Sequence, residues 1–115
     1  MEIKQLSPEF SVSAQITSKD LAQLQAQGIT TLIGNRPDGE GGAEQPAWDE
    51  LVRAAEALGI KAHLVPVVFD TINSADVRRF AALLQSGERV HAFCRSCARS
   101  TTLWALARVA QGETA

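Results

Sequence analysis

The sequence predicts an α/β fold in which one domain, residues 1–115, holds a mainly parallel sheet of about four to five strands flanked by helices. Two observations lead to this fold class. Short apolar runs alternate along the chain with segments in which apolar residues recur at helical spacing. Strands that alternate with helices pair in parallel through right-handed crossovers, and 115 residues is a usual length for a single domain.

In the first part of the chain, two short strands, one helix and a third strand are expected. Ser18 suits the N-cap of a helix that carries Leu21 and Leu24 on its apolar face, and Gly28 ends that helix. An apolar run follows at once, as is typical of a buried strand. The expected ranges are strands at 3–6 and 10–14, a helix at 18–28 and a strand at 29–33.

A loop rich in glycine, proline and acidic residues, residues 34–46, leads into the second part. Helical spacing resumes at Trp48, and Ser74 is the expected cap of the following helix. Trp48 and Trp104 occupy apolar helical positions and are expected in the core. The expected ranges are helices at 48–58, 74–84 and 100–110, strands at 61–68 and 90–93, and a loop at 70–73.

Charge and hydropathy narrow the classes of partner. The formal net charge is −2 and the basic residues form no stripe, so nucleic acid is not expected as a partner. No apolar run is long enough to span a bilayer, and the N-terminus lacks the order of a signal peptide, which favours a cytoplasmic protein. His63 and His91 fall on expected strands and supply no zinc-ligand pair, so neither a metal nor another cofactor is expected.

The segment from Cys94 to Ser100 carries the candidate chemistry. It joins an apolar run to a helical pattern, so its N–H groups converge at a helix N-terminus, and the dipole and neighbouring arginines favour a thiolate at Cys94. Arg99 is suited to clamp oxyanions with its guanidinium fork. Cys94 and Arg99 are therefore candidate catalytic residues. The candidate substrate-binding residues of this loop are Arg95, Ser96, Cys97, Ala98 and Ser100.

Two of these residues have simpler alternative roles. Arg95 is equally well explained as a solvated surface charge. Ser100 either contacts the sulfur of Cys94 or only caps the helix, and capping is the simpler expectation.

The Cys94 loop resembles the active loop of the cysteine phosphatase and rhodanese superfamilies, because four residues separate Cys94 from Arg99 and Ser100 follows. The wider chain is similar to one family, the beta-lactamase-hydrolase-like protein, phosphatase-like domain, which implies a dual-specificity-phosphatase-like fold. Three blocks in the family's order carry this resemblance, namely Asn35-Arg36-Pro37-Asp38-Gly39-Glu40, the segment from Gly59-Ile60 to Val65-Pro66-Val67, and the Cys94 loop followed by Thr102-Leu103-Trp104-Ala105-Leu106.

The resemblance also links residues outside the loop to the site. Asn35 and Arg36 follow an expected strand and join the substrate-binding candidates, with an Asx turn before Pro37 as the structural alternative. Asp70 follows the next strand along the chain and is a candidate catalytic acid. Sites in parallel sheets form beyond the carboxyl ends of strands, so these residues are expected on the same rim as Cys94. Asp38 and Asp76 compete with Asp70 for the role of acid, and an ordinary loop aspartate is the structural alternative.

Loop length bears on the expected reaction. Tyrosine and dual-specificity phosphatases have five residues between cysteine and arginine, whereas rhodanese-like sulfurtransferases resemble this chain in having a shorter loop. Domains of the similar family also occur joined to persulfide-oxygenase-like domains, and Phe93 stands where phosphatases usually have histidine. We therefore expect a sulfurtransferase that moves sulfane sulfur from a small anionic donor through a Cys94 persulfide.

Two other functions stay open. Phosphoester hydrolysis through a cysteinyl-phosphate is the first alternative, since Arg99-Ser100 matches the phosphatase ending of the loop. The second is a non-catalytic redox or binding module, because Cys97 stands where the similar family usually has glycine and creates a Cys-x-x-Cys spacing. The donor, the acceptor and the oligomeric state are not determined by these patterns.

Overall fold

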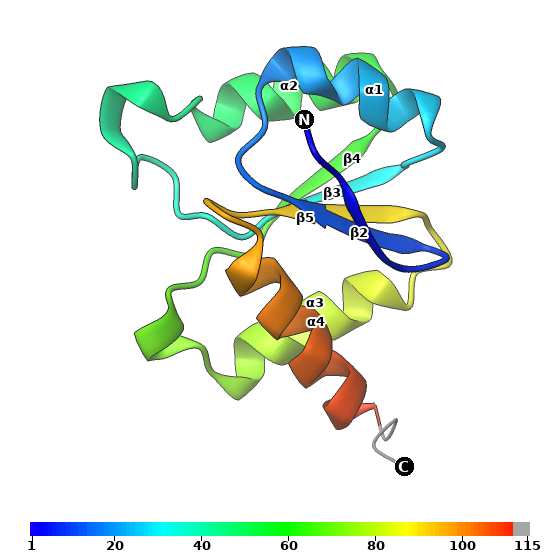
Figure 1. Cartoon of the computed structure of the whole chain (residues 1–115), viewed down its shortest axis with the longest axis vertical. Coiled ribbons are helices and arrows are strands. Elements are labelled where there is room, and N and C mark those ends of the chain that lie inside the picture. The colour runs from blue at the N-terminus through cyan, green and yellow to red at the C-terminus, as the bar shows by residue number, and fades with distance from the viewer. Residues whose placement is uncertain (112–115) are drawn as a thin grey trace.

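A five-stranded sheet forms the centre of the computed structural model, which describes residues 1–111 (Figure 1). The strand order is β1-β2-β5-β3-β4, and each pair except the antiparallel β1–β2 pair is parallel. The predicted α/β fold with a mainly parallel sheet is therefore confirmed. The strands are β1 (Lys4–Ser7), β2 (Phe10–Ser13), β3 (Thr31–Gly34), β4 (Lys61–Leu64) and β5 (Val90–Phe93).

Helices cover both faces of the sheet. The helices α1 and α2 lie on one face, and α3 and α4 lie on the other (Figure 1). Short 3-10 turns at Ser18–Asp20, Gly42–Glu44 and Phe69–Thr71 interrupt the connections. The helices are α1 (Leu21–Ala26), α2 (Trp48–Ala57), α3 (Ser74–Leu84) and α4 (Ala98–Ala110). Among residues 1–111, none of these helices has the length and apolar character needed to cross a membrane.

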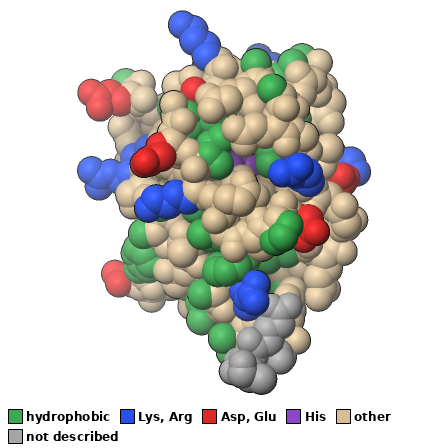
Figure 2. All heavy atoms as spheres, turned by 45° about the vertical axis from the view of Figure 1, so that its right-hand side comes forward, with side chains coloured by type: hydrophobic (Ala, Val, Ile, Leu, Met, Phe, Trp, Pro, Cys, Tyr) green, Lys and Arg blue, Asp and Glu red, His purple; other side chains and the backbone are tan. Residues whose placement is uncertain are grey.

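The central strand β5 is buried on both faces and divides the core in two. Val90 and Ala92 belong to the apolar cluster beneath α3 and α4, whereas Phe93 belongs to the cluster beneath α1 and α2. This alternation follows from the two-residue period of a strand. Trp48 and Trp104 pack against these clusters, as predicted. On the face shown in Figure 2, acidic and basic side chains are interspersed.

Two of the predicted boundaries that differ from the structure do so for identifiable reasons. The strand predicted at 61–68 ends earlier because Pro66 has no N–H to donate, although Val65 and Val67 still donate to carbonyls at the end of β3 at 2.9 and 3.0 Å. The cap of α3 is Asn73, not Ser74. Its side chain accepts from the N–H of Asp76, and its own N–H donates to the Asp76 carboxylate.

Candidate active site

The Cys94 loop begins at the carboxyl end of β5 and is held by the ends of both neighbouring strands. On one side, the N–H of Cys94 donates to the Ser13 carbonyl at 3.4 Å, and the N–H of Gln15 donates to the Arg95 carbonyl at 3.4 Å. On the other side, the N–H of Asn35 donates to the Phe93 carbonyl at 2.8 Å. The loop therefore occupies the centre of the rim, as expected for a site beyond the carboxyl ends of parallel strands.

Cys94 is fully buried, and its sulfur lies near enough to Arg99 to contribute to the raised pKa of the guanidinium. Arg99 is the second residue of α4, so its position follows from the early start of this helix at Ala98. The pKa of Arg99 is raised, first by its hydrogen bonds to Glu40 and further by the nearby Cys94 sulfur. The predicted pairing of a cysteine with an arginine at a helix N-terminus is therefore present in the structure.

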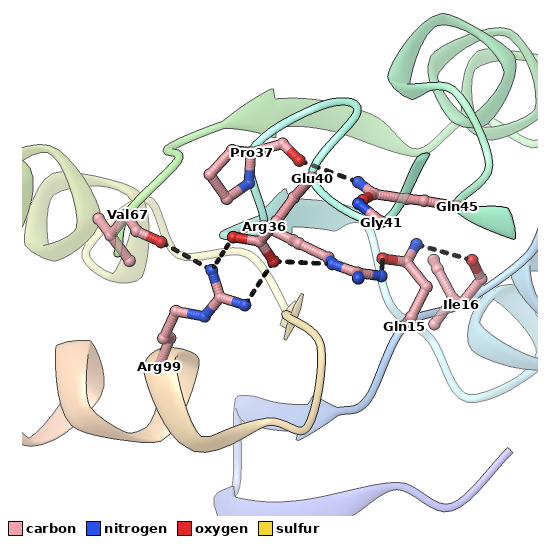
Figure 3. Close-up of polar contacts among 9 residues, drawn as sticks. All are labelled: Gln15, Ile16, Arg36, Pro37, Glu40, Gly41, Gln45, Val67 and Arg99. Carbon is pink, nitrogen blue, oxygen red and sulfur yellow. Dashed lines mark hydrogen bonds and ion pairs between the residues drawn. The ribbon is translucent and has the colours of Figure 1, made fainter. Parts of the chain in front are cut away.

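Glu40 holds the guanidinium of Arg99 from the loop that follows β3 (Figure 3). The Nη1 and Nη2 atoms of Arg99 donate to Oε2 and Oε1 of Glu40 at 2.8 and 2.7 Å, and Nη1 also donates to the Val67 carbonyl at 3.0 Å. Arg36 donates from Nε to the same carboxylate at 3.0 Å. Hydrogen bonding to Arg99 is the largest cause that lowers the pKa of Glu40 from 4.5 to about 2, with Arg36 contributing further.

These contacts leave one edge of the Arg99 guanidinium available. Arginine has five N–H donors. Both hydrogens of Nη1 and one of Nη2 are committed to Glu40 and Val67. The Nε–H and the second Nη2–H lie on a single edge that Glu40 and Val67 do not occupy, and such an edge can bind two oxygens of an oxyanion side by side.

A pocket of about 660 Å³ opens beside the loop, and every side chain on its wall is polar or charged. It is lined by Gln15, Arg36, Glu40, Gly41, Glu44, Gln45, Arg95 and Arg99. Of the predicted residues, Arg36, Arg95 and Arg99 are thus brought together. Arg36 is held in place by Glu40 and by the side chain of Gln15, which accepts from its Nη1 at 3.2 Å (Figure 3).

The other predicted loop residues do not line this pocket. Ser96 and Cys97 line a second, smaller pocket of about 160 Å³, together with residues of the N-terminus and of β2. Ala98 is exposed as the first residue of α4. Both Cys94 and Cys97 are free thiols in this structure.

Asn35 and Ser100 are fully buried and do not line either pocket beside the loop. The Ser100 hydroxyl donates to Oδ1 of Asn35 at 2.9 Å, and Nδ2 of Asn35 donates to the Val65 carbonyl at 2.9 Å. The expectation that Ser100 caps the helix is wrong, because α4 begins two residues earlier. The pair instead joins the end of β3, the segment after β4 and the first turn of α4.

Asp70 lies on the 3-10 turn Phe69–Thr71, where its residue is exposed. It is not among the residues that line the pocket beside Arg99. Of the competing aspartates, Asp76 is the N3 residue of the α3 capping box, and Asp38 accepts from the N–H of Trp48 at 3.0 Å. Both competitors therefore have structural partners, and the role of Asp70 remains a prediction.

Cys97 has an unusual backbone conformation. Its φ is 74° and its ψ is −10°, and within residues 1–111 it is the one residue other than glycine with a positive φ. A side chain in this left-handed region costs roughly 1–2 kcal/mol relative to ordinary backbone conformations. Cys97 therefore holds this conformation at an energetic cost that glycine would not have.

His91 lies on β5, as predicted, and is fully buried between two serines of β2. Its Nδ1 lies 2.7 Å from Ser11 Oγ, and its Nε2 lies 2.8 Å from Ser13 Oγ. Because the Ser13 hydroxyl donates to the Ala14 carbonyl, it accepts from Nε2–H, which leaves Nδ1 to accept from Ser11. Burial lowers the pKa of His91 from 6.5 to about 4, so the ring is neutral near pH 7.

The family model of the Beta-lactamase hydrolase-like protein, phosphatase-like domain, matches residues 2–111. The chain belongs to this family. A curated relative of this phosphatase-like domain, the Beta-lactamase hydrolase-like protein of Agrobacterium fabrum, is 32% identical over 114 residues, which are 98% of this chain and 26% of that protein. The domain thus spans about a quarter of the length of the curated relatives it matches.

Solved structures are similar over nearly the whole domain. A protein of Neisseria meningitidis Z2491 named a "putative phosphatase" has a TM-score of 0.86 and 35% identity, covering 97% of this chain and 80% of that one. The core catalytic domain of the PP-IP phosphatase SIW14 from S. cerevisiae has a TM-score of 0.63 and 13% identity, covering 92% and 73%. The second likeness shows a shared fold alone.

The expected sulfurtransferase activity is wrong, because the family and its structural neighbours are phosphatase-like. The expectation rested on the short spacing between Cys94 and Arg99. That spacing sets the number of backbone N–H donors that the loop offers. The width of the site depends instead on segments that lie far away in the sequence. Arg36 and Glu40, from the loop after β3, help to form a pocket of about 660 Å³ that no residue count in the Cys94 loop reveals.

Proposed function

We propose that this domain hydrolyses phosphoesters with Cys94 as nucleophile. One observation carries the proposal: Arg99, at the N-terminus of α4, lies near the buried Cys94 sulfur and also lines a pocket together with Arg36 and Arg95. Backbone N–H groups at a helix N-terminus and an arginine fork both suit a phosphoryl group. The phosphatase-like family of the chain supports the same chemistry.

The proposed reaction has two steps. In the first, the Cys94 thiolate attacks phosphorus, an S–P bond forms, and the ester P–O bond breaks as the alcohol leaves with a proton from a general acid. In the second, water attacks phosphorus and gives a proton back to the same carboxylate, the S–P bond breaks, inorganic phosphate leaves and the thiolate is restored. Arg99 and the loop N–H groups stabilise the equatorial oxygens in both transition states.

We assign the general acid to Asp70. Its 3-10 turn follows β4 and precedes α3, so it extends from the same rim of the sheet as the Cys94 loop. Asp38 and Asp76 are committed to structural hydrogen bonds, which leaves Asp70 as the exposed candidate. Because the nucleophile must be a reduced thiol, we place the reaction in the reducing cytoplasm.

Phosphate release tests the proposal. Purified protein is incubated with p-nitrophenyl phosphate and with small phosphomonoesters, and inorganic phosphate is measured for the wild type and for Cys94→Ser. We expect turnover that Cys94→Ser abolishes, inhibition by vanadate, and a phosphorylated protein by intact mass after acid quenching. Arg78→Ala, at an exposed position in the middle of α3, serves as the control that keeps activity.

Two results would count against the proposal. Phosphate release that persists in Cys94→Ser would exclude this nucleophile. Binding of phosphate analogues without any turnover would favour a non-catalytic binding module instead. Asp70→Asn is expected to slow the first step most for esters with poor leaving groups, and equal effects on p-nitrophenyl and alkyl esters would reject the assignment of the acid.

A further inference from the structure

The pocket beside the Cys94 loop carries three guanidinium groups and the two carboxylates of Glu40 and Glu44. Its wall carries the guanidinium groups of Arg36, Arg95 and Arg99. Under the proposed function, Arg99 binds the phosphoryl group that reacts. The remaining two arginines therefore face a part of the pocket that the reacting group does not fill.

Arg95 differs from the other two arginines in its partners. Arg36 and Arg99 share the carboxylate of Glu40, so their charge is partly neutralised within the protein. Within residues 1–111, the Arg95 side chain has neither a hydrogen bond nor an ion pair, although it lines the same pocket. An unpaired guanidinium on a pocket wall is a binding group for an anionic part of a ligand.

The wall also argues against an aromatic substrate. Pockets for aryl groups are lined mainly by apolar and aromatic side chains. Here every side chain on the wall is polar or charged. A volume of about 660 Å³ has room for a small molecule larger than phosphate itself.

From these observations we propose that the substrate class is a compact, hydrophilic small molecule with at least two phosphoryl groups, and that Arg95 determines this specificity by binding the group that does not react. This inference rests on the proposed phosphatase function and deepens it. Arg99 binds the phosphoryl group attacked by Cys94, and Arg95 binds the second group at the mouth of the pocket. Arg95 contributes to binding in the ground state and the transition state alike, so its loss raises KM and leaves kcat nearly unchanged.

Matched pairs of sugar and glycerate phosphates test the inference. Phosphate release is measured for fructose 1,6-bisphosphate against fructose 6-phosphate, and for 2,3-bisphosphoglycerate against 3-phosphoglycerate, so that two spacings are sampled. We expect kcat/KM to favour at least one bisphosphate over its monophosphate by about tenfold or more, as for one charge-assisted contact. Arg95→Ala should abolish this preference through KM, while Arg78→Ala, the exposed control on α3, should keep it.

Several outcomes would overturn the inference. Equal turnover of monophosphates and bisphosphates would do so, as would an Arg95→Ala effect of the same size on both members of a pair. Faster turnover of a phosphotyrosine peptide than of either bisphosphate would show that the substrate is aromatic.

Calorimetry separates this inference from the proposed function. The Cys94→Ser protein is titrated with the same pairs of compounds. If no compound is turned over but a bisphosphate binds more tightly in an Arg95-dependent manner, the proposed hydrolysis is wrong and the two-anion pocket stands. If both members of each pair bind equally, the two-anion pocket is wrong whatever the turnover.

Discussion

Glu40 and Arg99 form a two-point ion pair, with distances of 2.7 and 2.8 Å, between the loop after β3 and the first turn of α4. The pair determines which edge of the guanidinium faces a ligand, because Glu40 occupies both Nη atoms and leaves the Nε edge free. Glu40 therefore acts as a positioning residue, and its low pKa of about 2 keeps the pair ionised at any pH where the protein would work.

Removing the charge of Glu40 should impair the chemical step. In Glu40→Gln, the side chain keeps its shape but no longer holds Arg99 by two charge-assisted bonds, so we expect kcat for phosphate release to fall by about tenfold or more. Steady-state kinetics with the preferred substrate measures this. Glu44→Gln removes the same charge from the same pocket and reports the purely electrostatic effect. Identical kinetics in the two variants would show that Glu40 acts only through its charge.

Stability should decline in mild acid because of His91. The pKa of this ring is lowered to about 4 in the folded protein and is about 6.5 in the unfolded chain. Above pH 6.5 the ring is neutral in both states, so the full free energy of unfolding is present. As the pH falls from 6.5 to 4, only the unfolded chain takes up the proton, and the free energy of unfolding decreases. The expected loss is about 3 kcal/mol of unfolding free energy. Urea titrations at pH 7 and pH 4 measure it. His91→Gln keeps a donor and an acceptor but cannot titrate, so an unchanged loss in this variant would contradict the assignment.

The buried contact between Asn35 and Ser100 should contribute to stability. Asn35→Ala leaves the Ser100 hydroxyl and the Val65 carbonyl without their partner, and we expect a loss of about 2–3 kcal/mol. Ser100→Ala removes one donor and should cost about 1–2 kcal/mol. Denaturant unfolding of both single variants and the double variant gives the coupling energy. Strict additivity would mean that the two side chains do not stabilise each other.

Relief of the backbone strain at Cys97 should stabilise the protein. At a φ of 74°, glycine is tolerated and alanine is not, so Cys97→Gly is expected to be more stable than Cys97→Ala by about 0.5–1 kcal/mol. The neighbouring residue Ala98 is the first residue of α4, where alanine is favoured over glycine. Ala98→Gly is therefore expected to be less stable than the wild type. Thermal unfolding of the three variants checks both signs. A less stable Cys97→Gly than Cys97→Ala would show that the left-handed conformation costs nothing here.

The order of elements could be predicted from the sequence because it depends on local patterns. The two-residue and helical periods of apolar residues, together with Gly28 as a helix terminator, were sufficient to place the strands and helices to within a few residues. The Cys94 loop was predicted for the same reason, since its strand, its cysteine, its arginine and its helix follow one another along the chain. The errors at 61–68 and at Ser74 arose where a single proline or a competing cap decided a boundary.

The partners of the site could not be predicted in this way. Glu40 is one of 13 acidic residues, and nothing local distinguishes it from the others. Its contact with Arg99 exists because the parallel sheet brings the ends of β3 and β5 side by side, joining residues 59 positions apart. The sequence by itself thus determined the nucleophile loop and the fold class, since both depend on neighbours along the chain. Only the tertiary structure decided the width, the charge and the fixed arginines of the pocket, because these depend on strand ends that meet in space.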